Sequence, residues 1–294
     1  MAEKILVTGA SGHLGGLIVK KLLARGVAPS NIIAGTRDTA KLADLAAKGI
    51  ETRKVDFNDE ANLSKAFAGA DTILIVSTDA LDAAGTRLKQ HRAAVKAAVA
   101  VGAKRLAYTS LPVPDASHVS FAPDHLGTEQ AIKATGLPYL IFRNNWYQEN
   151  LFMSLPNAFK SGQWYTSAGA GRTAFAARED IADAIAAALA APAGASAIYT
   201  LTGAEALPPA EIAKLAANAT GKPLAVVDLT DEQLAGGMKA AGVPEAFIPT
   251  LVSFDTAARE GDLSIVTSDI EKLTGRKPKA VATFIKENAK GLAG

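Results

Sequence analysis

A glycine-rich turn near the N-terminus constrains the fold more than any other feature of this sequence. The segment VTGASGHLGG (7–16) separates an apolar run from an amphipathic one, and Gly9, Gly12 and Gly15 have the spacing G-x-x-G-x-x-G. Glycines in such a turn let backbone N–H groups approach a pyrophosphate, which then lies at the positive end of the following helix. Because the turn lies between a predicted strand and a predicted helix, we interpret it as a dinucleotide-binding loop rather than a turn that binds nothing.

Strand-like and helix-like segments alternate through the first two hundred residues. Apolar and β-branched runs predict strands at 4–9, 31–37, 50–56, 71–77, 105–110, 138–143 and 197–202. Helical patterns fill the gaps, for example at 14–25, 60–68, 82–101 and 179–190. This alternation predicts an α/β fold, a doubly wound parallel sheet of the Rossmann type with helices on both faces.

The pattern changes after about residue 203, where prolines separate short helical pieces. We therefore predict a dinucleotide-binding domain over 1–150, to which 176–202 return as part of the sheet. Residues 203–294 are predicted to form a smaller, mainly helical lobe on the substrate side.

Composition excludes several functions. The 31 basic and 29 acidic residues leave no strong field for nucleic acid or an anionic membrane, and the absence of cysteine excludes disulfides and thiolate chemistry. The sequence IADAIAAALAAPAGASAI contains Asp183 and Pro192, so it predicts a buried helix and a turn rather than a membrane span. The histidines show no metal-ligand spacing, so we expect no metal. We expect a soluble, cytoplasmic protein, and a homodimer is compatible with the sequence.

The end of the second predicted strand indicates which dinucleotide binds. An acidic residue there accepts hydrogen bonds from the ribose of NAD, whereas an arginine pairs with the 2′-phosphate of NADP. Arg37 comes first in this chain and Lys41 follows, which favours NADPH. Asp56 and Phe57 are expected beside the adenine. Ser77 and Thr78 are expected where the middle of the cofactor passes.

These segments together resemble a known family. The glycine motif, TR after the second strand, VDF after the third and YTS after the fifth are similar to atypical short-chain dehydrogenases of the NmrA-like group. Within that group, YTSL, DHLGTE and RNNWYQEN resemble bacterial NAD(P)H:quinone oxidoreductases of the second type and, more loosely, triphenylmethane dye reductases.

The resemblance implies roles for particular residues. It implies that Arg37 binds the 2′-phosphate and that Asn145 stands where the family usually has glycine. The residues implied to hold the phosphates are Gly9, Ala10, Ser11, Gly12, His13 and Leu14. Those implied to line the cofactor further along, including its nicotinamide end, are Ser77, Thr78, Arg143, Asn144, Asn145, Trp146, Tyr147 and Gln148.

The usual proton-transfer machinery of short-chain dehydrogenases is missing. None of the five tyrosines has a lysine four residues later. A quinone, whose reduced anion takes a proton from water, or a cationic dye, which needs none, can accept hydride without that pair. Eight of the 17 aromatic residues also cluster within 142–175, namely Phe142, Trp146, Tyr147, Phe152, Phe159, Trp164, Tyr165 and Phe175. We therefore predict NADPH-dependent hydride transfer to a quinone or a similar small aromatic substrate, with about half of these aromatics in the core.

His125 and Glu129 stand where a Tyr–Lys pair is found in ordinary relatives. Their spacing places both on one helix face, so His125 could protonate a reduced quinone with Glu129 orienting it. The alternative interpretation is a structural pair that steadies the helix, and we favour it slightly. Tyr147 is the other candidate catalytic residue, as a wall of the pocket beside the nicotinamide.

Two further functions stay open at this level. A dinucleotide-sensing regulator of the NmrA type would bind the cofactor and perform no chemistry. A reductase of phenylpropanoid-like aromatics would use a lysine on the helix that here holds His125. Lys133 is on that predicted helix, but two turns further along.

Overall fold

The computed structural model describes residues 3–81 and 85–294 and contains the predicted parallel sheet. All seven predicted strands are present: β1 (Ile5–Val7), β2 (Ile32–Thr36), β3 (Glu51–Lys54), β4 (Thr72–Ile75), β5 (Arg105–Ser110), β6 (Tyr139–Asn144) and β8 (Ala197–Leu201). Their order is β3-β2-β1-β4-β5-β6-β8, and the register of β1 pairs Leu6 with Ile33 on one side and with Ile73 on the other. The order reverses direction at β1, which leaves a crevice beyond the carboxyl ends of β1 and β4.

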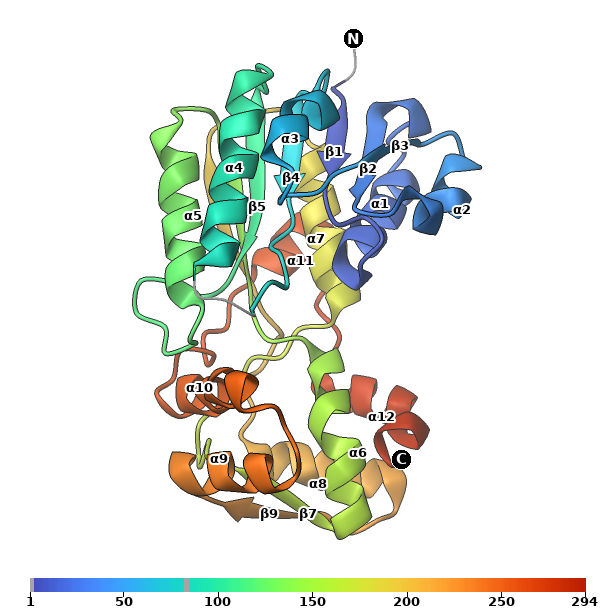
Figure 1. Cartoon of the computed structure of the whole chain (residues 1–294). Helices are drawn as coiled ribbons and strands as arrows, with labels where there is room; N and C mark the ends of the chain where they lie inside the picture. The colour runs from blue at the N-terminus through green and yellow to red at the C-terminus, as the bar shows by residue number, and fades with distance from the viewer. Residues whose placement is uncertain (1–2, 82–84) are drawn as a thin grey trace. The chain divides into compact units, whose positions relative to one another are not determined.

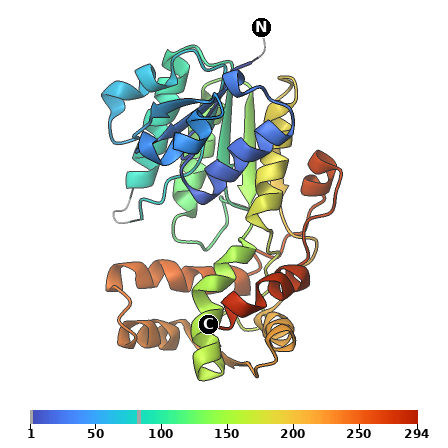
Figure 2. The ribbon, with the colours of Figure 1, turned by 90° about the vertical axis from the view of Figure 1, so that its right-hand side faces the viewer.

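Helices cover both faces of this sheet. The helices connected with it are α1 (His13–Ala24), α2 (Ala43–Ala46), α3 (Glu60–Phe67), α4 (Thr86–Ala100), α5 (Ala122–Ala134) and α7 (Arg178–Ala190). Figures 1 and 2 show α3, α4 and α5 on one face and α1 and α7 on the other. Strands β1, β2, β4 and β5 are buried along their whole length, which explains why their sequences are mostly apolar, whereas the edge strands β3 and β8 are partly exposed.

The predicted helices agree closely with the observed ones. Helix α4 was predicted from residue 82, but it begins at Thr86, and residues 82–84 lie outside the described residues. Gly85 precedes it with φ +79°, a left-handed conformation that glycine adopts without strain.

The remaining elements are mostly helical, as expected for the C-terminal region. They are α6 (Leu151–Ser161), β7 (Gln163–Thr166), α8 (Pro209–Thr220), β9 (Ala225–Asp228), α9 (Asp231–Ala240), α10 (Ile248–Arg259), α11 (Asp269–Thr274) and α12 (Val281–Leu292). Strands β7 and β9 form a separate two-stranded parallel sheet that the sequence did not predict. A second apolar core joins α6, α8 and α12 through residues such as Leu155, Ile212 and Phe284.

The chain forms two compact units. The first comprises 1–111, 123–143 and 181–199, and the second comprises 112–122, 144–180 and 200–294. Residues 144–150 therefore group with the second unit, whereas the sequence placed them with the first. No helix among the described residues is both long and apolar enough to span a membrane.

Candidate functional site

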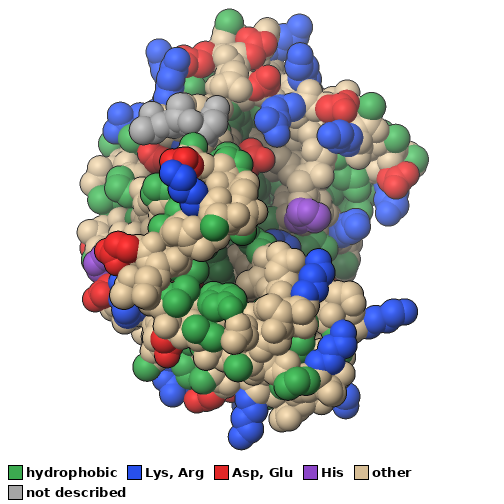
Figure 3. Space-filling view, turned by 60° about the horizontal axis from the view of Figure 1, so that its bottom comes forward, with side chains coloured by type: hydrophobic (Ala, Val, Ile, Leu, Met, Phe, Trp, Pro, Cys, Tyr) green, Lys and Arg blue, Asp and Glu red, His purple; other side chains and the backbone are tan. Residues whose placement is uncertain are grey.

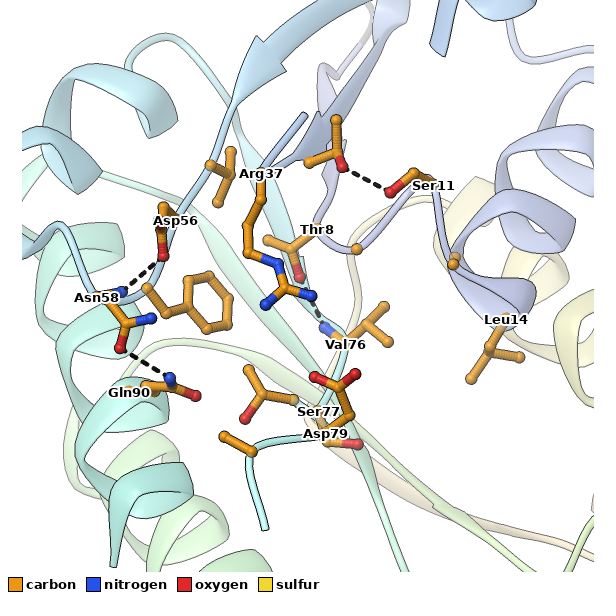
Figure 4. Close-up of a pocket in the computed structure, with 18 of the residues that line it drawn as sticks. Thr8, Ser11, Leu14, Arg37, Asp56, Asn58, Val76, Ser77, Asp79 and Gln90 are labelled. Atoms are coloured by element: carbon orange, nitrogen blue, oxygen red, sulfur yellow. Dashed lines mark hydrogen bonds between the residues drawn. The ribbon is translucent and has the colours of Figure 1, made fainter. Parts of the chain in front are cut away.

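A cavity of about 350 Å³ lies in the first unit, at the carboxyl ends of β1 to β4. Of the residues predicted to bind the dinucleotide, those that line it are Gly9, Ser11, Gly12, His13, Leu14, Arg37, Asp56, Phe57, Ser77 and Thr78. Figure 4 shows Ser11, Arg37, Asp56 and Ser77 arranged around this one space. Ala10 does not line the cavity, because it is buried in the loop, where its N–H donates to the carbonyl of Gly35.

The glycine loop has the geometry of an anion cradle. Gly9 has φ +62°, and its carbonyl accepts a hydrogen bond of 2.9 Å from the Gly12 N–H. A Cβ on Gly15 would lie 2.3 Å from that carbonyl oxygen, so only glycine lets α1 approach the loop this closely. No side chain of residues 3–81 or 85–294 caps the start of α1, which leaves its first-turn N–H groups available to a phosphate. The loop therefore fits a dinucleotide pyrophosphate.

The strand ends beside the loop provide polar groups. The hydroxyls of Ser11 and Thr36 are 2.6 Å apart, which holds the loop against the end of β2. Arg37 follows at once and is exposed, and its guanidinium makes no ion pair with any residue that the structure describes. A guanidinium at this position can receive a phosphate without first giving up a protein partner.

Gly15 of the predicted loop lines the cavity as well, and sequence reasoning missed eight further residues, namely Thr8, Thr36, Val55, Asn58, Val76, Asp79, Ala80 and Gln90. Most of them adjoin predicted positions at strand ends, so the strand boundaries could have suggested them. Asn58 and Gln90 come from different elements, and the Gln90 amide donates to the Asn58 oxygen over 2.9 Å. No local pattern indicates that pair.

Behind Thr78, a hydrogen-bonded chain continues into the interior of the first unit. The Thr78 N–H donates to Nε2 of His91 over 3.0 Å, so this nitrogen is an acceptor and a neutral His91 carries its proton on Nδ1. Nδ1 lies 3.0 Å from the Thr128 hydroxyl, which donates to the Asp124 carbonyl. Burial, and then the charge of Arg87, lower the pKa of His91 to about 3. His91 is therefore neutral at physiological pH and connects α4 to the cavity wall.

His125 belongs to the same buried cluster. Its side chain is on α5 and the residue is 4% exposed, with Nδ1 2.8 Å from the Tyr108 hydroxyl and Nε2 2.9 Å from Nη2 of Arg87. Burial, and then the charges of Arg87 and His91, lower the pKa of His125 well below its usual value. The imidazole is held neutral by partners that the i,i+4 spacing did not suggest.

Glu129 takes part in a different cluster. It is fully buried, accepts a hydrogen bond of 2.7 Å from Ser110, and binds Arg143 through two hydrogen bonds of 3.0 and 2.8 Å. The Lys133 ammonium lies 3.4 Å from the same carboxylate. The partners of Glu129 are therefore Ser110, Arg143 and Lys133. Arg143 was predicted to line the cofactor, and in the structure its guanidinium binds the Glu129 carboxylate.

The segment from Asn144 to Gln148 belongs to the second unit. The Asn145 amide donates to the Leu263 carbonyl over 3.0 Å, and the Gln148 amide donates to the Lys279 carbonyl over 2.7 Å. The guanidinium of Arg178 lies 4.7 Å above the ring of Tyr147, and burial raises the pKa of the Tyr147 phenol. These contacts fasten the segment to its own unit.

A second cavity of about 350 Å³ lies within this unit, between α6, β7, α9 and α10. Of the eight clustered aromatics, those that line it are Trp146, Trp164, Tyr165 and Phe175. Phe142 is instead buried in the large sheet, stacked on Tyr199 at 6.0 Å, and Phe159 lies in the second core. Phe175 belongs to the second core as well, and Tyr147 and Phe152 do not line the cavity. Among the described residues, no group of three or more His, Cys, Asp and Glu could hold a metal.

The sequence profile described as the NmrA-like family matches residues 1–285. Quinone oxidoreductase 2 of Escherichia coli (strain K12) is 34% identical over 96% of this chain and 97% of its own length. NAD(P)H azoreductase of Xenophilus azovorans is 27% identical over 97% of this chain and 98% of its own length.

Solved structures agree. The NADPH-dependent quinone oxidoreductase of E. coli, complexed with NADPH, superposes with a TM-score of 0.91 at 34% identity, covering 96% of this chain and 99% of that one. The triphenylmethane reductase of Citrobacter sp., complexed with NADP(H), superposes with a TM-score of 0.90 at 33% identity, covering 97% and 99%.

Proposed function

The chain belongs to the NmrA-like family, and from this we propose that it is an NADPH-dependent reductase that transfers hydride to a quinone or a similar electron-poor aromatic acceptor. It is an NAD(P)H-dependent oxidoreductase with the Rossmann-like fold of that family. Our proposal concerns the acceptor, which we take to be a quinone or a similar electron-poor aromatic molecule. The observation that carries the proposal is the cavity around the glycine loop, where the start of α1 and the Arg37 guanidinium are engaged by no side chain of the described residues.

Within this cavity, the glycine loop and the first turn of α1 would hold the pyrophosphate, and Arg37 would bind the 2′-phosphate. Asp56 and Phe57 would flank the adenine, and Ser77 and Thr78 would contact the middle of the cofactor. We place the segment 143–148 at its nicotinamide end on the resemblance to the family. The bound cofactor supplies the hydride, and the protein supplies orientation and a site that excludes water.

We propose that no side chain needs to donate a proton. His125 is neutral and its ring nitrogens are engaged by Tyr108 and Arg87, so we assign it a structural role. Burial raises the pKa of Tyr108, so its phenol also stays protonated. A reduced quinone would take its proton from water, and a cationic dye accepts hydride at carbon and needs no proton.

We propose that the aromatic cavity of the second unit receives the acceptor. Trp146 and Phe254 pack there with ring centroids 4.3 Å apart, and such faces suit a flat, apolar ring. Tyr147, which adjoins Trp146, would form the neighbouring wall, so Tyr147→Ala should impair turnover of quinones and dyes alike. Lys and Arg side chains are interspersed with Asp and Glu on the face in Figure 3, which suits a small neutral substrate better than nucleic acid or a membrane. A cytoplasmic location remains part of the proposal.

The proposal is tested by following NADPH oxidation at 340 nm with the purified protein. The acceptors are benzoquinone, menadione, an azo dye and malachite green. We expect turnover with at least one quinone and with the cationic dye. Tight NADPH binding without turnover of any acceptor would instead indicate a dinucleotide-sensing regulator.

A further inference from the structure

The aromatic cavity of the second unit contains a carboxylate. Among the described residues that line it, Asp255 is the one Asp, Glu, Lys, Arg or His, and the others are mostly apolar. It comes from α10, where Leu251, Phe254 and Ala258 line the same cavity at the spacing of one helix face. A single acid in such surroundings is costly to bury unless its oxygens are hydrogen-bonded.

The hydrogen bonds of Asp255 are concentrated on one oxygen. Its Oδ2 accepts from the Thr166 hydroxyl over 2.7 Å and from the Ser167 N–H over 2.8 Å. Oδ1 makes no hydrogen bond with any residue that the structure describes. The neighbouring cation, Arg259, donates two hydrogen bonds of 2.9 Å to Asp231 and another to the Ser167 carbonyl. Asp255 is therefore held in place through one oxygen while the other keeps its capacity to accept.

We propose that Asp255 determines which aromatic molecules this cavity accepts, by receiving a hydrogen bond on Oδ1 from an N–H or O–H group on the ligand ring. A ligand with such a donor replaces the water that it displaces from the carboxylate. A ligand of the same shape without a donor displaces the water but offers Oδ1 no hydrogen bond in return. Sites with such an unsatisfied acceptor bind the ligand that lacks the donor much more weakly. The favoured ligand is thus a flat aromatic carrying an amino or hydroxyl group. This inference rests on the proposed function in placing the acceptor here.

Two quinones that differ in one substituent test it. 2-Amino-1,4-naphthoquinone and menadione share a ring system, with an amino group in one where the other has a methyl. Both tryptophans of the chain line the cavity, so quenching of their fluorescence reports binding in the absence of NADPH. The chain has no cysteine with which a quinone could form an adduct. We expect the aminoquinone to bind about tenfold more tightly or better.

Asp255→Asn tests the role of Oδ1 most directly, because it replaces that acceptor by a donor of similar size. The Ser167 N–H requires an acceptor, so the amide oxygen must take the place of Oδ2, which puts an NH₂ donor where Oδ1 was. The preference for the aminoquinone should then disappear or reverse. Asp255→Leu should also abolish it while keeping or improving the binding of menadione, a gain that an unfolded variant would not show. Glu260→Gln, which removes an exposed charge one residue beyond α10, should keep the wild-type preference.

Three results would overturn the inference: equal affinities in the wild type, a preference that survives in Asp255→Asn, or no quenching by either quinone. Steady-state kinetics with NADPH separate it from the proposed function. Turnover of both quinones without discrimination would contradict the role of Asp255 alone. Discrimination in binding without NADPH oxidation would contradict the proposed reductase activity alone.

Discussion

Nη2 of Arg87 lies 2.9 Å from Nε2 of His125, inside the first unit. A guanidinium can only donate, so Nε2 is the acceptor and the proton of the neutral imidazole lies on Nδ1, facing the Tyr108 hydroxyl. Both residues are buried, and without this contact the buried Arg87 guanidinium would lose one of its hydrogen-bond acceptors. This relationship explains why a histidine stands on α5, at the place where ordinary short-chain dehydrogenases have a catalytic residue.

Removal of the imidazole should therefore affect stability more than chemistry. His125→Ala should lower the free energy of unfolding by about 1–3 kcal/mol, because it removes one acceptor from the buried Arg87 guanidinium and the hydrogen bond with Tyr108. The turnover of quinones per folded molecule should fall less than about tenfold. Urea unfolding and kcat are measured on the same preparation, with exposed His118→Ala as the control. A loss of 10²–10⁴ in kcat with unchanged stability, the range typical of a general acid, would make His125 the proton donor.

The two buried histidines also predict how stability depends on pH. The pKa of His91 falls from 6.5 in the unfolded chain to about 3 in the folded one, so the unfolded chain binds the additional proton between these values. Stability should be complete above about pH 6.5 and should decline as the pH falls, by about 1.4 kcal/mol per pH unit for each such histidine. Denaturant unfolding between pH 7.5 and 4.5 measures the slope. His91→Gln should make it shallower, and an unchanged slope would show that His91 does not contribute.

Cofactor preference should depend on Arg37. Arg37→Ala should weaken NADPH binding by about 1.5–3 kcal/mol, the range for a hydrogen bond to a charged group, and leave NADH almost unaffected. Calorimetric titration with both cofactors measures the difference, and Lys41→Ala serves as the control for a nearby positive charge. Equal losses for NADPH and NADH would show that Arg37 does not read the 2′-phosphate.

Two glycines of the loop should respond differently to substitution. A Cβ on Gly12 would lie 3.2 Å from the Gly9 oxygen, which a small shift accommodates, whereas a Cβ on Gly15 would lie 2.3 Å from it. Gly12→Ala should fold but lose affinity for NADPH, because the methyl group enters the phosphate cradle. Gly15→Ala should lower the free energy of unfolding by about 1–3 kcal/mol. Undiminished NADPH affinity in Gly12→Ala would refute the assignment of the loop.

The sequence predicted the large sheet because most of its strands are local apolar or β-branched runs between turns and helices. It missed β7 and β9, since QWYT and AVVD are four residues each and pair across sixty positions of the chain. Both are partly exposed rather than fully buried, so neither has the continuous apolar pattern of the central strands.

The candidate site also contains residues that the sequence could predict and contacts that it could not. Gly9, Arg37 and Ser77 could be predicted because the end of a parallel strand marks its position in the fold. The partners of His125 could not. The i,i+4 spacing predicts contacts within one helix only, whereas Arg87 lies 38 positions earlier, on α4.

The central claim is that hydride passes directly from NADPH to an aromatic acceptor, and isotopic labelling tests it most directly. Malachite green is reduced with NADPH carrying deuterium at one of the two C4 positions, and the colourless product is analysed by mass spectrometry. A hydrogen delivered to carbon does not exchange with water, so we predict one deuterium in the product from one labelled cofactor and none from the other. Formation of the product without deuterium from either cofactor, or no product despite bound NADPH, would contradict the account.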